Sequence, residues 1–445
     1  MDPVINRRHL LRSLGLSTGA TMLGALAPRI TQAQSAPGEA KPAEDAPWFE
    51  LGILDDPIQN NQLLHYLAAT YSGQADIGEV LDTAHRIKSN DEWSWPTQWI
   101  KTAERIRGMA DASLARGHKL SSGQAYLRAA NYFRAALIHH PEPKDPSVLS
   151  TGRKSVQAFD KAIKLLGLPA QAVRIPYERS GLPGYFFQSP IATGKAPVLI
   201  MHQGRDAWPE ESKYIADAAL ARGYHCLMFH GPGQGMAIRE QQLAFRPDWE
   251  RVVMPVVDFA IRQTGVDPSR IALMGLSMGG ALAPRAAAFE KRIKILIANP
   301  GVLNWGEAMF DQFNQLFPEI MQLLEKDPNA FNAAMGQAMQ QVPLYRWYMN
   351  DSMNKHGSST PSELMVKLKT FNNETIVDRI TCRTLVMDGT AEGFSVGQAK
   401  KLFDALRGPK EYMLFSEQDT GLLHCQEGAQ AVANHRMFDW LDQYL

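Results

Sequence analysis

The chain has 445 residues, of which 45% are hydrophobic and 21% are charged. This is ordinary globular composition in a chain long enough for two or three domains, and it excludes a wholly disordered chain, a collagen-like chain and a small disulfide-stapled scaffold. Lysine plus arginine and aspartate plus glutamate number 46 each, so the formal charge is zero and nothing favours nucleic acid as a partner.

Cysteine usage gives no sign of a disulfide framework or a metal site. Cys226, Cys382 and Cys425 lie far apart, and no two of them form a CxxC pair or show the spacing of a zinc site. We therefore expect free thiols and no structural metal. No motif in the sequence calls for a cofactor.

The first 33 residues have the architecture of an export signal. A basic region ends in Asn6–Arg12 (NRRHLLR), an apolar run follows over 14–27, and Thr31-Gln32-Ala33 resembles a cleavage site. Adjacent arginines before two leucines are typical of a twin-arginine signal. The apolar run is shorter than the roughly 20 residues that span a bilayer, so we expect no permanent membrane anchor. The sequence predicts transient contact with an export machinery and a periplasmic or secreted protein, after a linker over 34–47.

Residues 48–168 are predicted to form a helical domain. Ser121-Ser122-Gly123-Gln124 fits a capping box, and Tyr126, Ala130, Phe133 and Leu137 then recur at helical spacing. Amphipathic runs also surround 63–69 and 100–115. No catalytic pattern stands out in this segment, so we expect its side chains to serve mainly in packing.

From about Val173 to the end, short apolar runs alternate with helix-length segments. This alternation predicts βαβ units and a mainly parallel sheet whose carboxyl edge carries the chemistry. The expected strands are 197–203, 224–230, 270–276, 293–299, 384–388 and 411–415. The glycine-rich turn over 231–235 lacks the Lys-Ser/Thr of a phosphate-binding loop, and we interpret it as a structural connection.

The most specific motif is Gly275-Leu276-Ser277-Met278-Gly279, between a predicted strand and a predicted helix over 281–290. A G-x-S-x-G sequence in this context is the nucleophile elbow, a tight turn that exposes a reactive serine hydroxyl. The flanking glycines allow the backbone to crowd there. We expect Ser277 to be the nucleophile and the Met278 amide to help stabilise an oxyanion.

A serine nucleophile needs a base and an acid, which in this fold follow it along the chain. Of the downstream histidines, His356 precedes the penultimate strand and His435 lies in a helix, whereas His424 follows the last strand and is the expected base. For the acid, Glu392 lies three residues after Gly389 and is preferred to Asp388 at the strand end. Asp419 is a third candidate.

The second oxyanion amide is expected in the loop Gln203-Gly204-Arg205-Asp206, after the strand that ends near His202. Gly204 or Arg205 would supply the amide. His202 is equally consistent with lining the substrate pocket and with a structural role.

The interval over 304–379 is much longer than a βα connection requires. Its methionines and aromatic residues recur at helical spacing, which predicts a helical cap whose apolar side chains partly face an apolar or aromatic substrate. Glu307 at its start is a hypothetical extra acid or base in substrate binding or carbon–carbon cleavage, although a structural role is favoured for it.

Several local sequences together resemble one family. FHGPGQG, VDPSRIALMGLSMGG, APRAAAF, LVMDG, GLLHCQEGA and the upstream GQAYLRAANYFRAA are similar to stretches of α/β-hydrolases, in the group with 2,6-dihydroxypseudooxynicotine hydrolase, fungal polyketide-shortening hydrolases and related esterases. The resemblance implies an α/β-hydrolase fold with a mainly parallel sheet, an N-terminal helical domain and a helical cap. It also implies the triad Ser277, Glu392 and His424, with glutamate where the group usually has aspartate.

These features predict a serine hydrolase that cleaves an ester or lactone of a small, apolar or aromatic molecule through an acyl-enzyme. The resemblance keeps open a carbon–carbon hydrolase that acts beside a ketone on an aromatic substrate. A peptidase and a catalytically inactive binding protein are less favoured alternatives. The sequence leaves the oligomeric state open and allows a homodimer.

Overall fold

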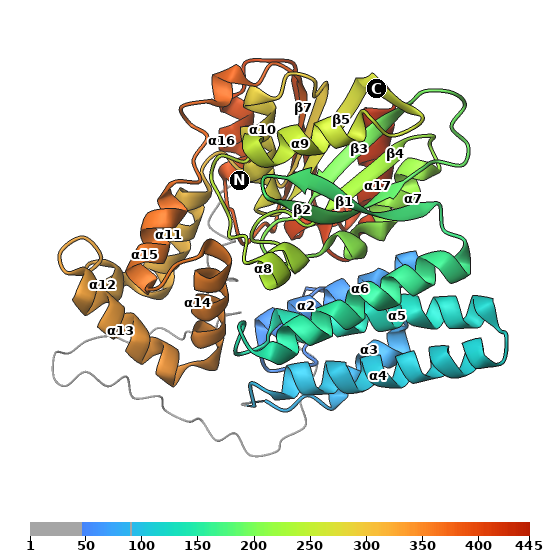
Figure 1. Cartoon of the computed structure of the whole chain (residues 1–445). Coiled ribbons are helices and arrows are strands. Elements are labelled where there is room, and N and C mark those ends of the chain that lie inside the picture. The colour runs from blue at the N-terminus through green and yellow to red at the C-terminus, as the bar shows by residue number, and fades with distance from the viewer. Residues whose placement is uncertain (1–46, 90) are drawn as a thin grey trace.

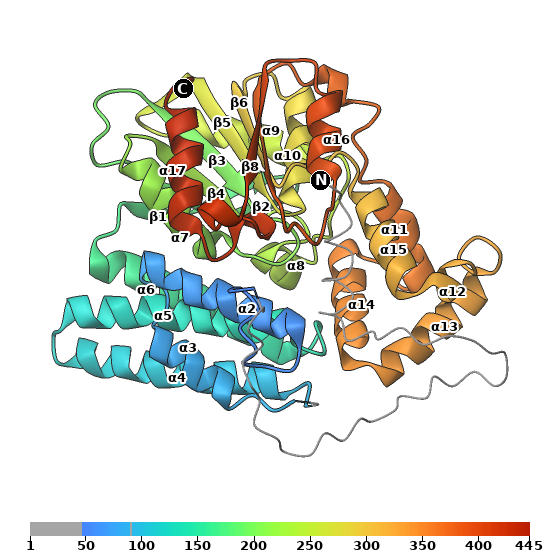
Figure 2. The ribbon, with the colours of Figure 1, turned by 180° about the vertical axis from the view of Figure 1, so that it is seen from behind.

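The computed structural model describes residues 47–89 and 91–445. The expected export signal, and the linker apart from Pro47, lie outside the described residues. Figures 1 and 2 show three groups of elements: a layer of helices between Pro57 and Leu166, a sheet flanked by helices, and a group of helices between Trp305 and Lys369 at one side. None of the described helices has the length and apolar character needed to cross a membrane.

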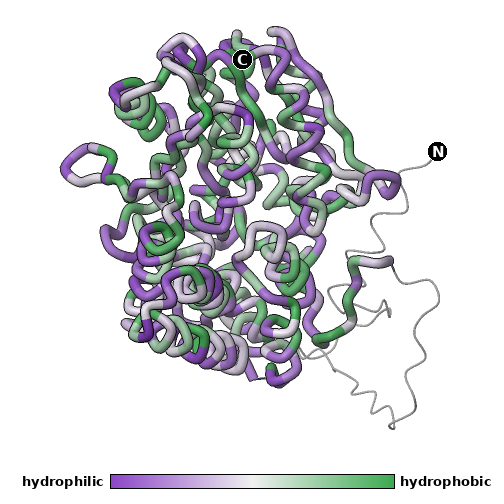
Figure 3. The backbone as a smooth tube through the Cα atoms, turned by 90° about the vertical axis from the view of Figure 1, so that its right-hand side faces the viewer, coloured by the Kyte–Doolittle hydropathy of each residue, from purple (hydrophilic) through white to green (hydrophobic). Residues whose placement is uncertain are grey.

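The helical layer precedes the sheet in the chain. Its helices are α2 (Pro57–Ala68), α3 (Ile77–His85), α4 (Ser94–Ala115), α5 (Lys119–Ile138) and α6 (Pro146–Leu166). Asp56, Asp76 and Asp145 cap α2, α3 and α6 by accepting hydrogen bonds from first-turn amides. Hydrophobic and hydrophilic residues are mixed along these helices (Figure 3), except that α5 is buried on all sides from Ala129 to Ile138.

In the described part of the chain, eight strands form one sheet in the order β1-β2-β4-β3-β5-β6-β7-β8. The strands are β1 (Ala170–Tyr177), β2 (Ser180–Phe187), β3 (Ala196–His202), β4 (His225–Phe229), β5 (Val266–Leu276), β6 (Ile295–Asn299), β7 (Arg383–Gly389) and β8 (Lys410–Phe415). Only the pairs β1–β2 and β2–β4 are antiparallel. The mainly parallel sheet predicted from the sequence is therefore confirmed.

Helices cover both faces of the sheet. They are α7 (Lys213–Leu220), α8 (Gly235–Gln241), α9 (Glu250–Ala260), α10 (Gly279–Phe289), α16 (Gln398–Ala405) and α17 (Gln430–Leu441). Between β6 and β7 the chain forms the cap helices α11 (Trp305–Leu316), α12 (Pro318–Met321), α13 (Pro328–Gln341), α14 (Pro343–His356) and α15 (Pro361–Lys369). Single-turn helices include η2 (Pro209–Ser212) and η5 (His424–Gln426).

Two large hydrophobic cores lie on opposite faces of the sheet. One joins α9, α10 and α16 to the cap, with Met309, Phe313 and Phe331 among its buried side chains. The other joins α7 and α17 to the helical layer, where Trp99, Phe133 and Phe159 are fully buried. Each group of added helices thus shares its core with one face of the sheet.

The structure corrects one local prediction and adds two strands. Helix α5 begins at Lys119 with His118 as its cap, and the cap makes no side-chain hydrogen bond, so Ser121 and Ser122 lie within the helix and form no capping box. Strands β1 and β2 were not predicted because neither is a continuous apolar run. Strand β1, at the sheet edge, has only Ile175 and Tyr177 buried, and β2 contains Gly181, Pro183 and Gly184.

Candidate active site

Ser277 occupies a sharp turn between β5 and α10. Its backbone φ is 60°, in the left-handed region that non-glycine residues seldom adopt. The Ser277 amide donates to the Asn299 carbonyl at the end of β6 (2.7 Å), and the Ser277 carbonyl accepts from the Gly280 amide (2.7 Å). These bonds hold the serine in a strained conformation at the carboxyl edge of the sheet, ahead of the positive end of α10.

The glycines around the serine are required by close backbone contacts. A Cβ on Gly275 would collide with the Gly279 carbonyl, and one on Gly280 would collide with the Pro300 carbonyl. A side chain at either position would therefore force the turn apart. This is the physical basis of the G-x-S-x-G-G sequence in this chain.

Three residues distant in sequence meet at this edge. The Ser277 hydroxyl lies 2.8 Å from His424 Nε2, and His424 Nδ1 lies 2.7 Å from Glu392 Oε2 and 3.0 Å from Oε1. Glu392 is oriented by the amides of Phe394 (2.7 Å) and Ser395 (2.9 Å), which donate to its Oε1. Ser277 follows β5, Glu392 follows β7, and His424 follows β8.

The charges of this group support one another. Burial opposes ionisation of Glu392, but His424 and the two amides outweigh it and hold the pKa of Glu392 below its ordinary value. Burial likewise opposes protonation of His424, but the adjacent Cys425 sulfur and the Glu392 carboxylate outweigh it and hold the pKa of His424 well above its ordinary value. The pair is therefore suited to stabilise an imidazolium that forms beside Ser277.

The other candidate acids are engaged elsewhere. Asp388 accepts from the Tyr412 hydroxyl (2.6 Å) and the Gly389 amide (2.8 Å), and burial raises its pKa to about 6. Asp419 accepts from the Ser416 amide (2.8 Å) and forms an ion pair with Arg436. Neither makes a hydrogen bond to His424.

The other two downstream histidines do not contact the serine. His356 at the end of α14 packs between the rings of Phe245 and Phe371, and burial lowers its pKa to about 3. His435 lies on α17, is largely exposed, and pairs with Asp439 (3.0 Å).

The loop after β3 lies directly against the elbow. A Cβ on Gly204 would lie 2.6 Å from the Met278 amide nitrogen and 2.7 Å from Ser277 Cβ. Among the backbone hydrogen bonds of the described residues, none is donated by the amides of Gly204, Arg205 or Met278. Free amides beside a serine hydroxyl are the donors that an oxyanion hole requires.

Unlike the Arg205 amide, the Arg205 side chain has a structural role, because it connects the loop to the cap. Its buried guanidinium contacts Asp206 (2.8 Å), and from α14 Asp351 (2.7 Å) and the Ser352 hydroxyl (3.0 Å). Lys355, also on α14, pairs with both Asp206 (2.7 Å) and Asp351 (2.8 Å). The cap thus holds the loop through a buried network of four charges.

His202 and Glu307, expected as substrate-binding residues, have other partners in the described chain. His202 is buried, its Nδ1 donates to the Gln203 carbonyl (3.1 Å), and its Nε2 accepts from Trp249 Nε1 (3.2 Å). Burial lowers its pKa to about 4, so it is a neutral residue that supports the loop from behind. Glu307 accepts from Gln398 (2.7 Å) and Lys401 (2.7 Å), and Lys401 lowers its pKa.

Two neighbours of the triad, Phe394 and Asn299, were not among the residues predicted from the sequence. The Phe394 ring lies 4.8 Å from the His424 ring and is 41% exposed, so it forms an apolar wall beside the base. The Asn299 carbonyl accepts from both Ser277 and the Cys425 thiol (3.3 Å). Phe394 could have been found from its place two residues after the acid, whereas the role of Asn299 depends on strand register.

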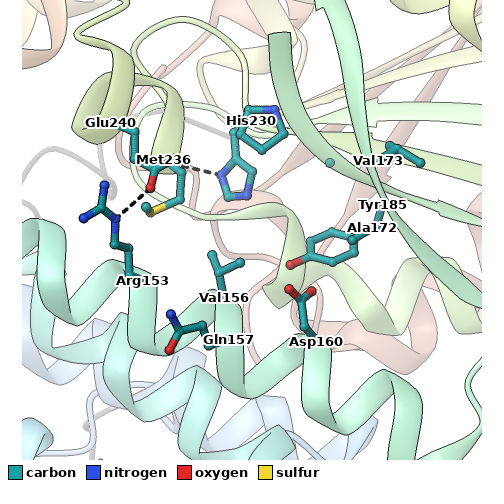
Figure 4. A pocket seen from close by; sticks show the side chains of 12 residues that line it. Arg153, Val156, Gln157, Asp160, Ala172, Val173, Tyr185, His230, Met236 and Glu240 are labelled. Atoms are coloured by element: carbon teal, nitrogen blue, oxygen red, sulfur yellow. Dashed lines mark hydrogen bonds and ion pairs between the residues drawn. The ribbon is translucent and has the colours of Figure 1, made fainter.

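A separate cavity of about 280 Å³ lies between α6, the β1–β2 hairpin and α8 (Figure 4). Figure 4 shows the Asp160 carboxylate facing Tyr185, and the Arg153–Glu240 ion pair (2.9 Å) at the other side. No triad residue lines this cavity. Within residues 47–89 and 91–445, no cluster of three or more histidine, cysteine, aspartate or glutamate side chains is arranged to hold a metal ion.

Comparisons with known proteins concern the family and the fold of the chain. The model of a family described as "Alpha/beta hydrolase family" matches residues 182–437. A Fusarium protein named hydrolase LUC6 is 35% identical over 410 residues, which cover 88% of this chain and 97% of that protein. A Gibberella moniliformis protein named 20-hydroxy-prefusarin hydrolase FUS2 is 33% identical over 401 residues, which cover 86% and 95%.

Among solved structures, 2,6-dihydroxy-pseudo-oxynicotine hydrolase is similar with a TM-score of 0.66 at 20% identity, covering 85% of this chain and 95% of that one. At this identity the likeness concerns the fold, and its coverage includes the helical layer as well as the sheet. With the family match over most of the sheet domain and the two relatives along nearly their whole length, the chain belongs to the alpha/beta hydrolase family and is a hydrolase.

Proposed function

We propose that this hydrolase cleaves an ester or lactone of a small, apolar or aromatic substrate through an acyl-enzyme on Ser277. The observation that carries the proposal is the hydrogen-bonded series from Ser277 through His424 to Glu392, with contacts of 2.8 and 2.7 Å. This is the geometry by which a base activates a hydroxyl and a carboxylate orients the base.

In the proposed reaction, His424 Nε2 takes the proton of the Ser277 hydroxyl as its oxygen attacks the substrate carbonyl carbon. The amides of Met278 and the Gly204–Arg205 loop hold the negative oxygen of the tetrahedral intermediate. As the intermediate collapses, the imidazolium gives its proton to the departing alcohol. A water molecule then loses a proton to His424, attacks the acyl carbon, and releases the acid while Ser277 regains its proton.

A fluorophosphonate probe tests the nucleophile. We expect the wild type and Ser269→Ala, which alters an exposed serine, to be labelled, and Ser277→Ala to remain unlabelled. Labelling that persists in Ser277→Ala, or a wild type that takes no label, would contradict the proposal. The second outcome would favour a binding protein built on the hydrolase fold.

The bond type is tested with a panel of p-nitrophenyl esters set against aryl β-diketones. We favour the esters because Glu307, the hypothetical extra acid or base for carbon–carbon cleavage, is held by Gln398 and Lys401, and these contacts compete with any role in proton transfer. If only the diketones were hydrolysed, the proposed ester hydrolysis would be contradicted, and carbon–carbon cleavage beside a ketone would be the activity instead.

A further inference from the structure

The N-terminal helices contact both the Gln203–Asp206 loop, which would supply an oxyanion donor, and the loop that contains His424. The carboxylate of Glu211 links these two sets of contacts. Glu211 lies in η2, five residues beyond the end of the Gln203–Asp206 loop. Its carboxylate forms an ion pair with Arg134 of α5 (2.6 Å) and a contact with His65 of α2 (3.0 Å). It also accepts from the Trp208 amide (2.6 Å), which fixes it to its own segment.

Arg134 connects Glu211 to the oxyanion loop. Its Nη2 donates to the Asp206 carbonyl (2.9 Å), and its Nη1 donates to the Tyr66 hydroxyl (2.8 Å). The side chains of Arg134 and Glu211 are each 4% exposed, so both charges are removed from water. Because Asp206 ends the loop that contains Gly204, this guanidinium limits how far the loop can move.

His65 connects Glu211 to the loop of the proposed base. Its second ring nitrogen, Nδ1, lies 3.2 Å from Glu427, three residues after His424. On the same helix Leu64 packs against Leu422 and Leu423, just before His424. Helix α2 therefore contacts the His424 loop on both sides of the histidine.

We propose that Glu211 is a positioning residue which, through Arg134 and His65, holds the oxyanion loop and the His424 loop in register with each other. The inference rests on the proposed function and extends it, because it makes the N-terminal helices part of the acyl-transfer site. Two cations and two carboxylates balance in this group, so loss of one member leaves a buried charge without its partner. A loop displaced by an ångström is enough to slow the chemical step.

Glu211→Gln tests the proposal, with Glu240→Gln as the matched control. Glu240 also joins the helical layer to the sheet domain, by its ion pair with Arg153 (2.9 Å), but this pair touches neither loop. With the p-nitrophenyl ester that the wild type hydrolyses best, we expect Glu211→Gln to lower kcat about 10- to 100-fold, with KM changed less than about twofold. Glu240→Gln should leave both constants within about twofold of the wild type. Unchanged kcat in Glu211→Gln would overturn the proposal.

His65→Gln provides a milder variant in case Glu211→Gln does not fold. Its amide keeps a donor for one carboxylate but carries no charge, so we expect kcat to fall about 3- to 10-fold, again with little change in KM. A rise in KM alone would indicate a role in substrate binding and would contradict positioning.

Hydrogen–deuterium exchange measures the two loops without reference to catalysis. We expect peptides covering 203–208 and 420–428 to exchange faster in Glu211→Gln and His65→Gln than in Glu240→Gln, while the central strands remain protected. Unchanged exchange in both loops overturns the inference whatever the enzyme hydrolyses. A wild type that takes no fluorophosphonate label would overturn the proposed function instead, and the exchange result would still decide whether Glu211 holds the loops.

Discussion

Gly204 and Ser277 lie so close that no side chain fits between them. A methyl group on Gly204 would lie 2.7 Å from Ser277 Cβ and 2.6 Å from the Met278 amide nitrogen. The loop after β3 and the nucleophile turn are therefore in direct backbone contact. The position of each proposed oxyanion donor depends on the absence of this one Cβ.

Gly204→Ala should push the loop away from the serine and misplace one oxyanion donor. We expect kcat for ester hydrolysis to fall about 10²- to 10³-fold, the usual effect of losing such a donor. Gly336→Ala is the control, because a Cβ there meets nothing within 4 Å, and it should leave kcat unchanged. Steady-state kinetics of both variants decide the matter, and an active Gly204→Ala enzyme would remove this loop from the oxyanion hole.

Amide variants of Glu392 and Asp388 show which of these two carboxylates is the acid of the triad. Glu392→Gln should lower kcat about 10⁴-fold, because the amide no longer stabilises the imidazolium or selects its tautomer. Asp388→Asn should cost less than about 10-fold, since the asparagine oxygen can still accept from the Gly389 amide while its NH2 group donates to the Tyr412 hydroxyl oxygen. Both are measured with the same ester at neutral pH. The reverse order of effects would make Asp388 the acid.

His65 should make the stability of the protein depend on alkaline pH. Burial opposes its protonation, but the hydrogen bonds to Glu211 and Glu427 outweigh burial and raise its pKa from 6.5 to about 9. The folded protein thus holds this proton more tightly than the unfolded chain, so the stabilisation is complete below pH 6.5 and is lost as the pH rises through about 9. The shift corresponds to about 3 kcal/mol.

Urea unfolding across this pH range measures the effect. We expect the free energy of unfolding of the wild type to fall by about 3 kcal/mol more than that of His65→Phe between the two pKa values. Phenylalanine removes the titrating group and keeps a ring against Tyr66. Parallel curves for the two proteins would show that His65 is not protonated between its carboxylates.

Asp351 should be important for stability because it faces two buried cations. Replacement by asparagine leaves Arg205 and Lys355 with only Asp206 as a counter-ion. We expect Asp351→Asn to lower the free energy of unfolding by about 3 to 5 kcal/mol. Asp404→Asn removes an exposed pair with Lys400 on α16 and should change stability by less than about 0.5 kcal/mol. Similar losses in the two variants would contradict a buried network.

The paired arginines at the start of the chain should direct export. We propose that Arg7 and Arg8 are read by a twin-arginine machinery, so that the full chain, produced in a bacterium with this pathway, accumulates in the periplasm. Replacement of both by lysine should retain the protein in the cytoplasm, whereas Arg12→Lys should be exported. Cell fractionation followed by immunoblotting gives the result. Periplasmic protein from the double variant would contradict the proposal.

The central strands and the elbow could be predicted because their signals are local. The apolar runs PVLIMH and IALMGL are fully buried in their strands, and Ser277 lies in a short motif whose glycines follow from local crowding. Glu392 and His424 could be selected because chain order places them after successive strands. The prediction of a capping box at Ser121 was wrong because helix α5 begins about one turn earlier, at Lys119.

The connections between domains could not be predicted. Glu211 meets His65 across 146 positions and Glu427 lies far beyond both, so no spacing rule relates them. Each is an ordinary charged residue on an amphipathic segment, which by itself indicates only a solvated surface. Burial of these charges depends on how the helical layer packs on the sheet, and no local sequence pattern predicts that packing.

The shared cores also bear on how this enzyme can be altered. The core on one face of the sheet includes Trp99, Phe133 and Phe159 of the N-terminal helices, and the core on the other face includes side chains of the cap. Deletion of either group of helices would therefore expose a large hydrophobic surface of the sheet domain. A minimal hydrolase trimmed to its strands would aggregate. Replacement of the cap by that of a relative, to change specificity, would succeed only if the apolar cap residues that pack on the sheet domain were retained or replaced by residues of matching shape.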